Sequence, residues 1–187
     1  MKPEVYIIVA ADEKGGIGKS GKLPWHFKKE MQFFKEITAA TTDPAKQNIV
    51  IMGRATWQSI PEKFRPLPKR KNVILTHQND FSAPGAQTAN SLDNALDLAH
   101  ENESGSIEIE KIFIIGGAKV FAEAVEHPSI TGIYLTKIKA NYNCDTFFSE
   151  MPEKFSNKKL LKSDQEEGVS FDYYLYLKPR ASTPLDR

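Results

Sequence analysis

The sequence has little of three things that would indicate particular classes of protein: cysteine, excess charge and long apolar runs. Its one cysteine, Cys144, cannot form a disulfide within the chain and favours a reducing compartment. Because 25 basic residues nearly balance 24 acidic ones, the net charge of +1 attracts neither nucleic acid nor an anionic membrane. The apolar run near the N-terminus is far too short to span a bilayer and has no cleavage-like site. We therefore expect a cytoplasmic protein whose partner is a small molecule.

The remaining bulk properties favour one ordinary domain. The length of 187 residues suits a single domain with a real core, which we expect over residues 1–179, followed by a polar tail over residues 180–187. Neither histidine nor a second cysteine lies near Cys144, so we expect an inert thiol and no metal site. Nothing in the sequence requires more than a monomer.

Strand and helix signals alternate along the chain, which is typical of an α/β fold. Continuous apolar runs predict strands covered on both faces, whereas the alternating run over 169–177 predicts a half-exposed strand. Crossovers early in the chain and a hairpin at its end imply a mixed, mostly parallel sheet with antiparallel pairing at one edge. Strands are expected at 5–11, 48–52, 72–76, 112–115, 133–139, 158–162 and 169–177, and helices at about 27–40, after Gly53, after the N-cap Ser91 and at 118–126.

A glycine-rich stretch from Lys14 to Ser20 offers one functional alternative, a nucleotide-binding ATPase. A phosphate-binding loop needs a helix directly after it, because the helix N-terminus helps to bind the anion. Gly21 and Pro24 should keep the following residues irregular, and Glu13 stands where the first glycine of the standard motif belongs. The stretch is better interpreted as a mobile lid that closes over a ligand.

Glu30 is the acidic residue of greatest interest. The predicted helix has an inner stripe of Phe27, Met31, Phe34 and Ile37 or Thr38, and Glu30 lies at its edge without a lysine or arginine three or four positions away. Its carboxylate could reach water from the margin of the stripe, as glutamates usually do. Alternatively, an apolar environment could raise its pKa for hydrogen bonding or proton transfer. The helix alone leaves both alternatives open.

Three strand ends suit an anionic dinucleotide. Gly53-Arg54 and Gly116-Gly117 each lead from a strand into a helix, where backbone donors can approach phosphates closely. The third strand ends in Thr76-His77 and lacks the acidic residue that would bind a ribose 2′-hydroxyl, which favours a 2′-phosphate and therefore NADPH.

These segments together resemble the dihydrofolate reductases over nearly the whole chain. The segments that carry the resemblance are IVAAD, GIGKSGKLPW, Glu30 within KKEMQFF, IVIMGRATWQSIPEKFRPLPKR, FIIGGAKVF, YLTKI and DTFF. The resemblance implies a three-layer fold with an eight-stranded mixed sheet and four flanking helices. It also implies NADPH as hydride donor, 7,8-dihydrofolate as acceptor and sensitivity to antifolate inhibitors.

The resemblance assigns roles to individual residues. Glu30 would hydrogen-bond the pterin and promote protonation of its N5, with Trp25 and Thr136 ordering the water nearby. Arg70 would bind the α-carboxylate of the glutamate tail, whereas without the resemblance its place in the run KRK would favour an ordinary surface cation. The other residues expected around the substrate are Ile8, Val9, Met31, Phe34, Ile60, Phe64, Leu67 and Ile115.

On the cofactor side, the family joins the two glycines, here Gly116 and Gly117, by a cis peptide bond. The remaining expected cofactor contacts are Ala10, Ile17, Gly18, Lys19, Gly21, Leu23, Gly53, Arg54, Ala55, Thr56, Leu75, Thr76, His77, Ala118, Lys119, Val120 and Phe121.

The chain departs from the usual family pattern at a few positions. His77 and Asn90 replace basic residues, Phe121 replaces a tyrosine, and Phe64 replaces a polar residue at the rim of the tail pocket. A same-fold alternative is a reductase of the riboflavin pathway, but its substrate gives no reason for the Leu-Pro-Trp and Glu30 pair.

Overall fold

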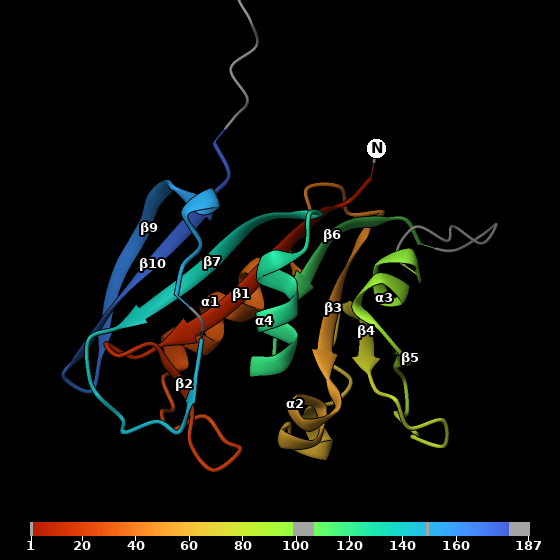
Figure 1. The fold of residues 1–187 in the computed structure, drawn as a ribbon, viewed down its shortest axis with the longest axis horizontal. Helices are drawn as coiled ribbons and strands as arrows, with labels where there is room; N and C mark the ends of the chain where they lie inside the picture. The colour runs from red at the N-terminus through yellow and green to blue at the C-terminus, as the bar shows by residue number, and fades with distance from the viewer. Residues whose placement is uncertain (1, 99–106, 149, 180–187) are drawn as a thin grey trace, which may run out of the picture.

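Eight strands form the central sheet of this computed structural model, which describes residues 2–98, 107–148 and 150–179 (Figure 1). The strand order is β5-β4-β3-β6-β1-β7-β10-β9. Six strands run parallel, whereas β10 pairs antiparallel with both β7 and β9. This arrangement confirms the predicted fold class. The strands are β1 (Glu4–Ala11), β3 (Gln47–Gly53), β4 (Arg70–Leu75), β5 (Gln87–Ala89), β6 (Ile109–Ile114), β7 (Ile130–Ile138), β9 (Asn157–Glu166) and β10 (Val169–Leu177).

Strand β1 lies inside the sheet and is covered on both faces, as its apolar sequence predicts. Val5, Ile7 and Val9 pack in one apolar cluster, whereas Tyr6 and Ile8 pack in another on the opposite face. A strand with two buried faces must be apolar at every position, so the continuous run follows from its place in the sheet.

Four α-helices flank the sheet: α1 (Lys28–Ala39), α2 (Arg54–Ser59), α3 (Leu92–Leu98) and α4 (Ala118–Glu126). In Figure 1, α3 and α4 lie in front of the sheet and α1 lies behind it, while α2 follows the carboxyl end of β3. The described residues also form two short 3-10 helices, η1 (Glu62–Phe64) and η2 (Glu153–Phe155). Ser91 caps α3 as predicted, because its Oγ accepts a hydrogen bond from the Asn94 N–H at 3.1 Å. The polar tail expected over residues 180–187 lies outside the described residues.

The buried face of α1 differs from the predicted stripe. Phe27 is buried at the N-cap as expected, but Met31 is 48% exposed and Phe33 is buried instead. The buried residues of the helix are Glu30, Phe33 and Thr38, and Phe34 and Ile37 pack partly buried against the apolar clusters, so the predicted inner positions 34, 37 and 38 are confirmed. The prediction was wrong about Met31 because it gave the inner positions to apolar residues and treated Glu30 as marginal.

Three short strands were not predicted from the sequence. They are β5 and the pair β2 (Gly16–Gly18) and β8 (Thr146–Phe147), which forms a separate antiparallel ribbon. Each has only two or three residues, too few to show a period of two.

Candidate active site

Several of the residues predicted to contact the cofactor lie at the carboxyl ends of neighbouring parallel strands. Strand β6 pairs with β1 on one side and with β3 on the other, and Ile114 of β6 is opposite both Ile7 and Ile51. Gly53, the last residue of β3, and Gly116-Gly117, which come shortly after β6, therefore meet at one edge of the sheet. In open α/β sheets this edge is where ligands bind.

Glu30 is a buried carboxyl group in this region. It is 7% exposed, and within the described residues its one hydrogen bond is a long one from the Thr136 hydroxyl to Oε1 at 3.4 Å. Burial raises the pKa of Glu30 to about 7, while the hydrogen bond from Thr136 acts in the opposite direction. The alternative in which Glu30 reaches water from the helix margin is therefore wrong. At neutral pH this carboxyl group can either donate or accept a proton.

Thr136 and Trp25 belong to the same buried region. Thr136 is 2% exposed and lies on β7, opposite Ala10 of β1. Trp25 is 5% exposed, and its Nε1–H has no hydrogen-bond partner among the described protein atoms. A buried N–H normally has a partner, so this indole is suited to bind a water or a ligand atom. Its role in ordering water remains a prediction.

Arg70 is buried, which a surface cation would not be. It is 6% exposed at the start of β4, with Nε donating to the Pro68 carbonyl at 3.0 Å and Nη1 to the Thr38 hydroxyl at 2.7 Å. Its Cζ lies 5.9 Å from the centre of the Phe34 ring. Burial lowers the pKa of Arg70, and no acidic side chain in the described part of the chain forms an ion pair with it. A buried guanidinium without an acidic partner is suited to bind an anionic ligand.

The other predicted substrate residues fall into two groups. Ile8 and Val9 are buried in β1, and a set of partly buried side chains packs against one apolar cluster. Met31 and Phe64 are instead 48% and 56% exposed, so only the packed set forms a preassembled apolar wall. The members of that set are Phe34, Ile60, Leu67 and Ile115.

The glycine that ends β3 and the two glycines that come after β6 are in close backbone contact. The Gly53 N–H donates to the Gly116 carbonyl at 2.7 Å, and the Gly116-Gly117 peptide bond is cis. A Cβ at Gly117 would lie 3.1 Å from Thr56 Oγ1, and one at Gly53 would lie 3.2 Å from Val120. Gly117 is also the N-cap of α4. Because glycines have no side chains, the backbone N–H groups at this helix N-terminus are accessible to the phosphates of a dinucleotide.

The remaining predicted cofactor residues differ in exposure. Phe121 is 5% exposed and packs edge-on against Phe148, with ring centres 5.5 Å apart, so it belongs to the core. The Thr76 hydroxyl accepts a hydrogen bond from the Gln78 N–H at 3.1 Å. Exposed positions are Lys19, Gly21, Leu23, Ala55, His77 and Lys119, and partly buried ones are Ala10, Ile17, Gly18, Arg54, Leu75, Ala118 and Val120.

The glycine-rich stretch is held by a network that the sequence did not reveal. Asp12 Oδ1 accepts hydrogen bonds from the N–H groups of Lys14 (2.9 Å) and Gly16 (2.8 Å). Its Oδ2 accepts one from the Tyr142 N–H at 3.1 Å and contacts Cys144 Sγ at 3.6 Å. We call these four contacts the Asp12 clasp. They join the glycine-rich stretch to the segment between β7 and β8.

A second tie strengthens the same connection. Asp145 Oδ2 accepts a hydrogen bond from the Ser20 N–H at 2.7 Å, and β2 pairs with β8. No helix follows Ser20 directly, because α1 begins only at Lys28. The geometry required of a phosphate-binding loop is therefore missing, as Pro24 predicted. An aspartate between a buried strand and a glycine run is a known turn signal, which could have identified Asp12.

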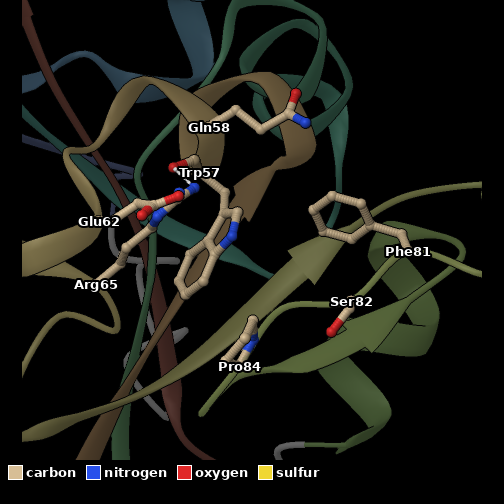
Figure 2. Close-up of a pocket in the computed structure, with 7 residues that line it drawn as sticks. All are labelled: Trp57, Gln58, Glu62, Arg65, Phe81, Ser82 and Pro84. Atoms are coloured by element: carbon tan, nitrogen blue, oxygen red, sulfur yellow. Dashed lines mark hydrogen bonds and ion pairs between the residues drawn. The ribbon is translucent and has the colours of Figure 1, made fainter.

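A separate hollow of about 450 Å³ lies between α2, η1 and the segment after β4. Figure 2 shows the Trp57 ring between the Glu62–Arg65 pair and Phe81, Ser82 and Pro84. Arg65 pairs with Glu62 at 3.1 Å and donates to the Trp57 carbonyl at 3.1 Å, so its charge is already satisfied. None of the predicted site residues lines this hollow.

Comparison with known proteins identifies the family. The sequence model described as dihydrofolate reductase matches residues 4–178. This chain belongs to the dihydrofolate reductase family. It is 38% identical to the dihydrofolate reductase of Drosophila melanogaster, over 89% of this chain and 93% of that protein. A solved structure of Schistosoma mansoni dihydrofolate reductase superposes with a TM-score of 0.81 at 35% identity, covering 96% of this chain and 100% of that one.

Other members of the dihydrofolate reductase family in the comparison are longer. The chain is 45% identical to bifunctional dihydrofolate reductase-thymidylate synthase 2 of Arabidopsis thaliana, over 75% of this chain but 25% of that protein. It covers 34% of the corresponding bifunctional protein of Glycine max. The chain therefore spans about a quarter to a third of these bifunctional relatives. Among the described residues, no helix is long and apolar enough to cross a membrane, and no group of three acidic, histidine or cysteine side chains could hold a metal ion.

Proposed function

We propose that this protein catalyses the NADPH-dependent reduction of 7,8-dihydrofolate to 5,6,7,8-tetrahydrofolate. The observation that carries the proposal is the buried carboxyl group of Glu30, whose pKa burial raises to about 7. A general acid is most effective when its pKa lies near the working pH. Membership of the dihydrofolate reductase family supplies the substrate class.

On the substrate side, Glu30 hydrogen-bonds the amino group and ring nitrogen of the pterin and promotes protonation of N5, with Thr136 and Trp25 supporting the water nearby. Two observations support this arrangement: Thr136 already donates to Glu30, and the Trp25 N–H has no partner among the described residues. Arg70 binds the α-carboxylate of the glutamate tail with a guanidinium group that no acidic residue in the described part of the chain neutralises. The rings pack against Phe34, Ile60, Leu67 and Ile115, with Met31 and Phe64 at the exposed rim.

On the cofactor side, NADPH supplies the hydride that reduces C6 of the pterin. Gly53, Gly116 and Gly117 offer backbone approach to its phosphates, and Arg54 and Thr56 lie at the adjoining helix start. Thr76 and His77 follow β4 without an acidic residue, which supports a 2′-phosphate and hence NADPH over NADH. The glycine-rich stretch covers the nicotinamide side and excludes water. The chain works as a cytoplasmic monomer and binds antifolate inhibitors in the substrate site.

The direct test mixes the protein with dihydrofolate and NADPH and follows the loss of reduced-nicotinamide absorbance. Turnover is expected, and Glu30→Gln should reduce the rate of hydride transfer by about 10²- to 10⁴-fold while leaving NADPH binding nearly intact. Absence of turnover in the unmodified protein would refute the proposal. ATP hydrolysis would favour the nucleotide-binding alternative, and reduction of a ribosyl-phosphate substrate would favour the riboflavin-pathway one.

A further inference from the structure

Tyr173 carries a buried hydroxyl group that the proposed reaction does not yet use. It lies on β10 with no exposed surface, and its Oη has no hydrogen-bond partner among the described protein atoms. The other buried side-chain atom in this condition is Trp25 Nε1, which belongs to the same apolar cluster as Tyr173. A buried hydroxyl without a partner is costly, so the position of this one calls for a physical reason.

The sheet register places Tyr173 beside the residue that bonds to Glu30. Tyr173 is directly opposite Thr136 in the antiparallel pair of β10 and β7, so both side chains lie on the same face of the sheet. The Tyr173 ring also packs on Phe33, one helical turn after Glu30, with ring centres 4.0 Å apart. Tyr173 therefore lies between Thr136, whose hydroxyl bonds to Glu30, and Phe33, which comes one helical turn after Glu30.

Four carboxylates and one ammonium group surround Tyr173. Burial raises the pKa of Tyr173, and four carboxylates add to the effect, Glu30 first, so the phenol remains a neutral donor at any physiological pH. The Lys162 ammonium of β9 lies 4.9 Å from the ring centre. The four carboxylates are Glu30 and Glu36 of α1 and Asp164 and Glu166 of β9.

Three of these carboxylates already have strong partners. Asp164 pairs with the Lys29 ammonium at 2.6 Å, and Glu166 accepts hydrogen bonds from two backbone N–H groups at the start of α1, each 2.9 Å long. Glu36 accepts a hydrogen bond from the Gln32 side chain at 2.7 Å. Only Glu30 is left with one long bond, from Thr136.

We propose that Tyr173 is a positioning residue for Glu30: its hydroxyl joins that of Thr136 in hydrogen bonding the Glu30 carboxyl group, directly or through one buried water. The effect of Tyr173 on catalysis rests on the proposed function, whereas the titration that tests the hydrogen bond does not. A donor to the carboxylate stabilises the ionised form, so Tyr173 holds down the pKa that burial raises. Burial raises the pKa of Glu30 and the hydrogen bond from Tyr173 lowers it, so that Glu30 can exchange a proton at neutral pH.

The decisive experiment titrates Glu30 in the ligand-free protein. The side-chain carboxyl carbons of glutamate are labelled with ¹³C, and the Glu30 signal is assigned by its loss in Glu30→Gln. In Tyr173→Phe, which keeps the ring, the titration midpoint of Glu30 should move upward by about half to one pH unit. Thr136→Val, which removes the observed donor, should move it in the same direction. Tyr176→Phe, on the same strand but packed against the opposite apolar cluster, should leave it unchanged.

A second measurement connects the titration to the reaction. With saturating ligands, the pH at which hydride transfer falls to half should rise in Tyr173→Phe by the same amount as the titration midpoint. An unchanged or lowered Glu30 midpoint in Tyr173→Phe would overturn the inference. If the unmodified protein does not reduce dihydrofolate, the proposed function fails, yet the titration still decides the role of Tyr173.

Discussion

Glu30 shows how one buried carboxyl group affects both catalysis and stability. Its pKa is raised from 4.5 to about 7, chiefly by burial. A carboxyl group with a raised pKa in the folded state holds its proton while the unfolded chain has lost it. The stability contribution is therefore fully present below pH 4.5 and is lost as the pH rises through 7.

This predicts that Glu30→Gln stabilises the folded protein at alkaline pH. At pH 8 or above, the neutral amide avoids a penalty of about 3 kcal/mol, which follows from a shift of this size at 1.36 kcal/mol per unit. The advantage should disappear as the pH falls below the ordinary glutamate value. Urea denaturation at a series of pH values measures it, with the exposed Glu13→Gln as control. A gain in stability that did not change with pH would contradict the assigned cause.

Arg70 provides a second prediction at the level of one side chain. Arg70→Met should raise the KM for dihydrofolate by about 10- to 100-fold, because a charge-assisted hydrogen-bonding partner of the carboxylate is lost. A pterin substrate without the glutamate tail should bind equally well to both proteins. The matched control is Lys71→Met, one residue further along β4.

Loss of the buried guanidinium removes an unpaired charge as well as its hydrogen bond to Thr38. The melting temperature of Arg70→Met should therefore change little. An equal loss of affinity for the tailless substrate would show that the effect is structural and would contradict the assigned role.

At the scale of elements, the Asp12 clasp ties the glycine-rich stretch to the segment before β8. The Asp12 carboxylate is 3% exposed and accepts hydrogen bonds both from Gly16 of β2 and from Tyr142 in the segment before β8. Burial acts to raise the pKa of Asp12, but hydrogen bonds from the N–H groups of Tyr142, Gly16 and Lys14 outweigh it and lower the pKa. The stabilisation is therefore present at neutral pH and is lost only as the pH falls through a value below 3.8.

We predict that Asp12→Ala costs about 2–4 kcal/mol of stability, because several backbone N–H groups lose a charged acceptor. Amide hydrogen exchange at Gly16 and Tyr142 should become faster, whereas exchange in the centre of β1 should change only with global stability. Asp12→Asn keeps one acceptor oxygen and should lose less than Asp12→Ala. The neighbouring Glu13→Ala serves as control, and unchanged exchange at Gly16 in Asp12→Ala would show that the strand pairing alone holds the stretch.

Sequence patterns predicted the long elements well and the short ones poorly. The apolar run of β1 and the alternation in β10 are long enough to show their periods, so these strands were predicted close to their actual bounds. Strand β5, with three residues, has no such signal. In α1 the polar Glu30 occupies an inner position, and a pattern that counts only apolar residues therefore missed it and included the exposed Met31.

The site shows a similar division. Glu30 and the glycine pairs could be selected from residue type and position, whereas Arg70 within KRK gave no sign of burial until the family resemblance was considered. Asp12 and Tyr173 were missed as functional candidates because their partners come from distant segments. Only the paired strands bring Tyr173 opposite Thr136, and only the folded loop brings Tyr142 to Asp12.

For the molecule as a whole, ligand binding at the junction of β1, β3 and β6 should couple to global stability. At about 100 times its Kd, NADPH should add roughly 2.7 kcal/mol, equivalent to a rise of about 5–10 °C in Tm for a domain of this size. NADH at the same concentration should give a smaller rise, and Arg54→Met should reduce the difference between the two. Thermal unfolding followed by circular dichroism measures both. Equal shifts with NADH and NADPH would contradict recognition of the 2′-phosphate.

The position of β1 also affects how the chain can be made. Strand β1 leaves the ribosome well before both of its sheet neighbours, since Val5 pairs with Ile112 and with Ile130. Until β6 and β7 emerge, both edges of this apolar strand lack their pairing partners. Such long-range pairing slows folding and leaves nascent chains open to aggregation. Synthesis of this protein should therefore depend on chaperones that shield β1 until β6 and β7 have been translated.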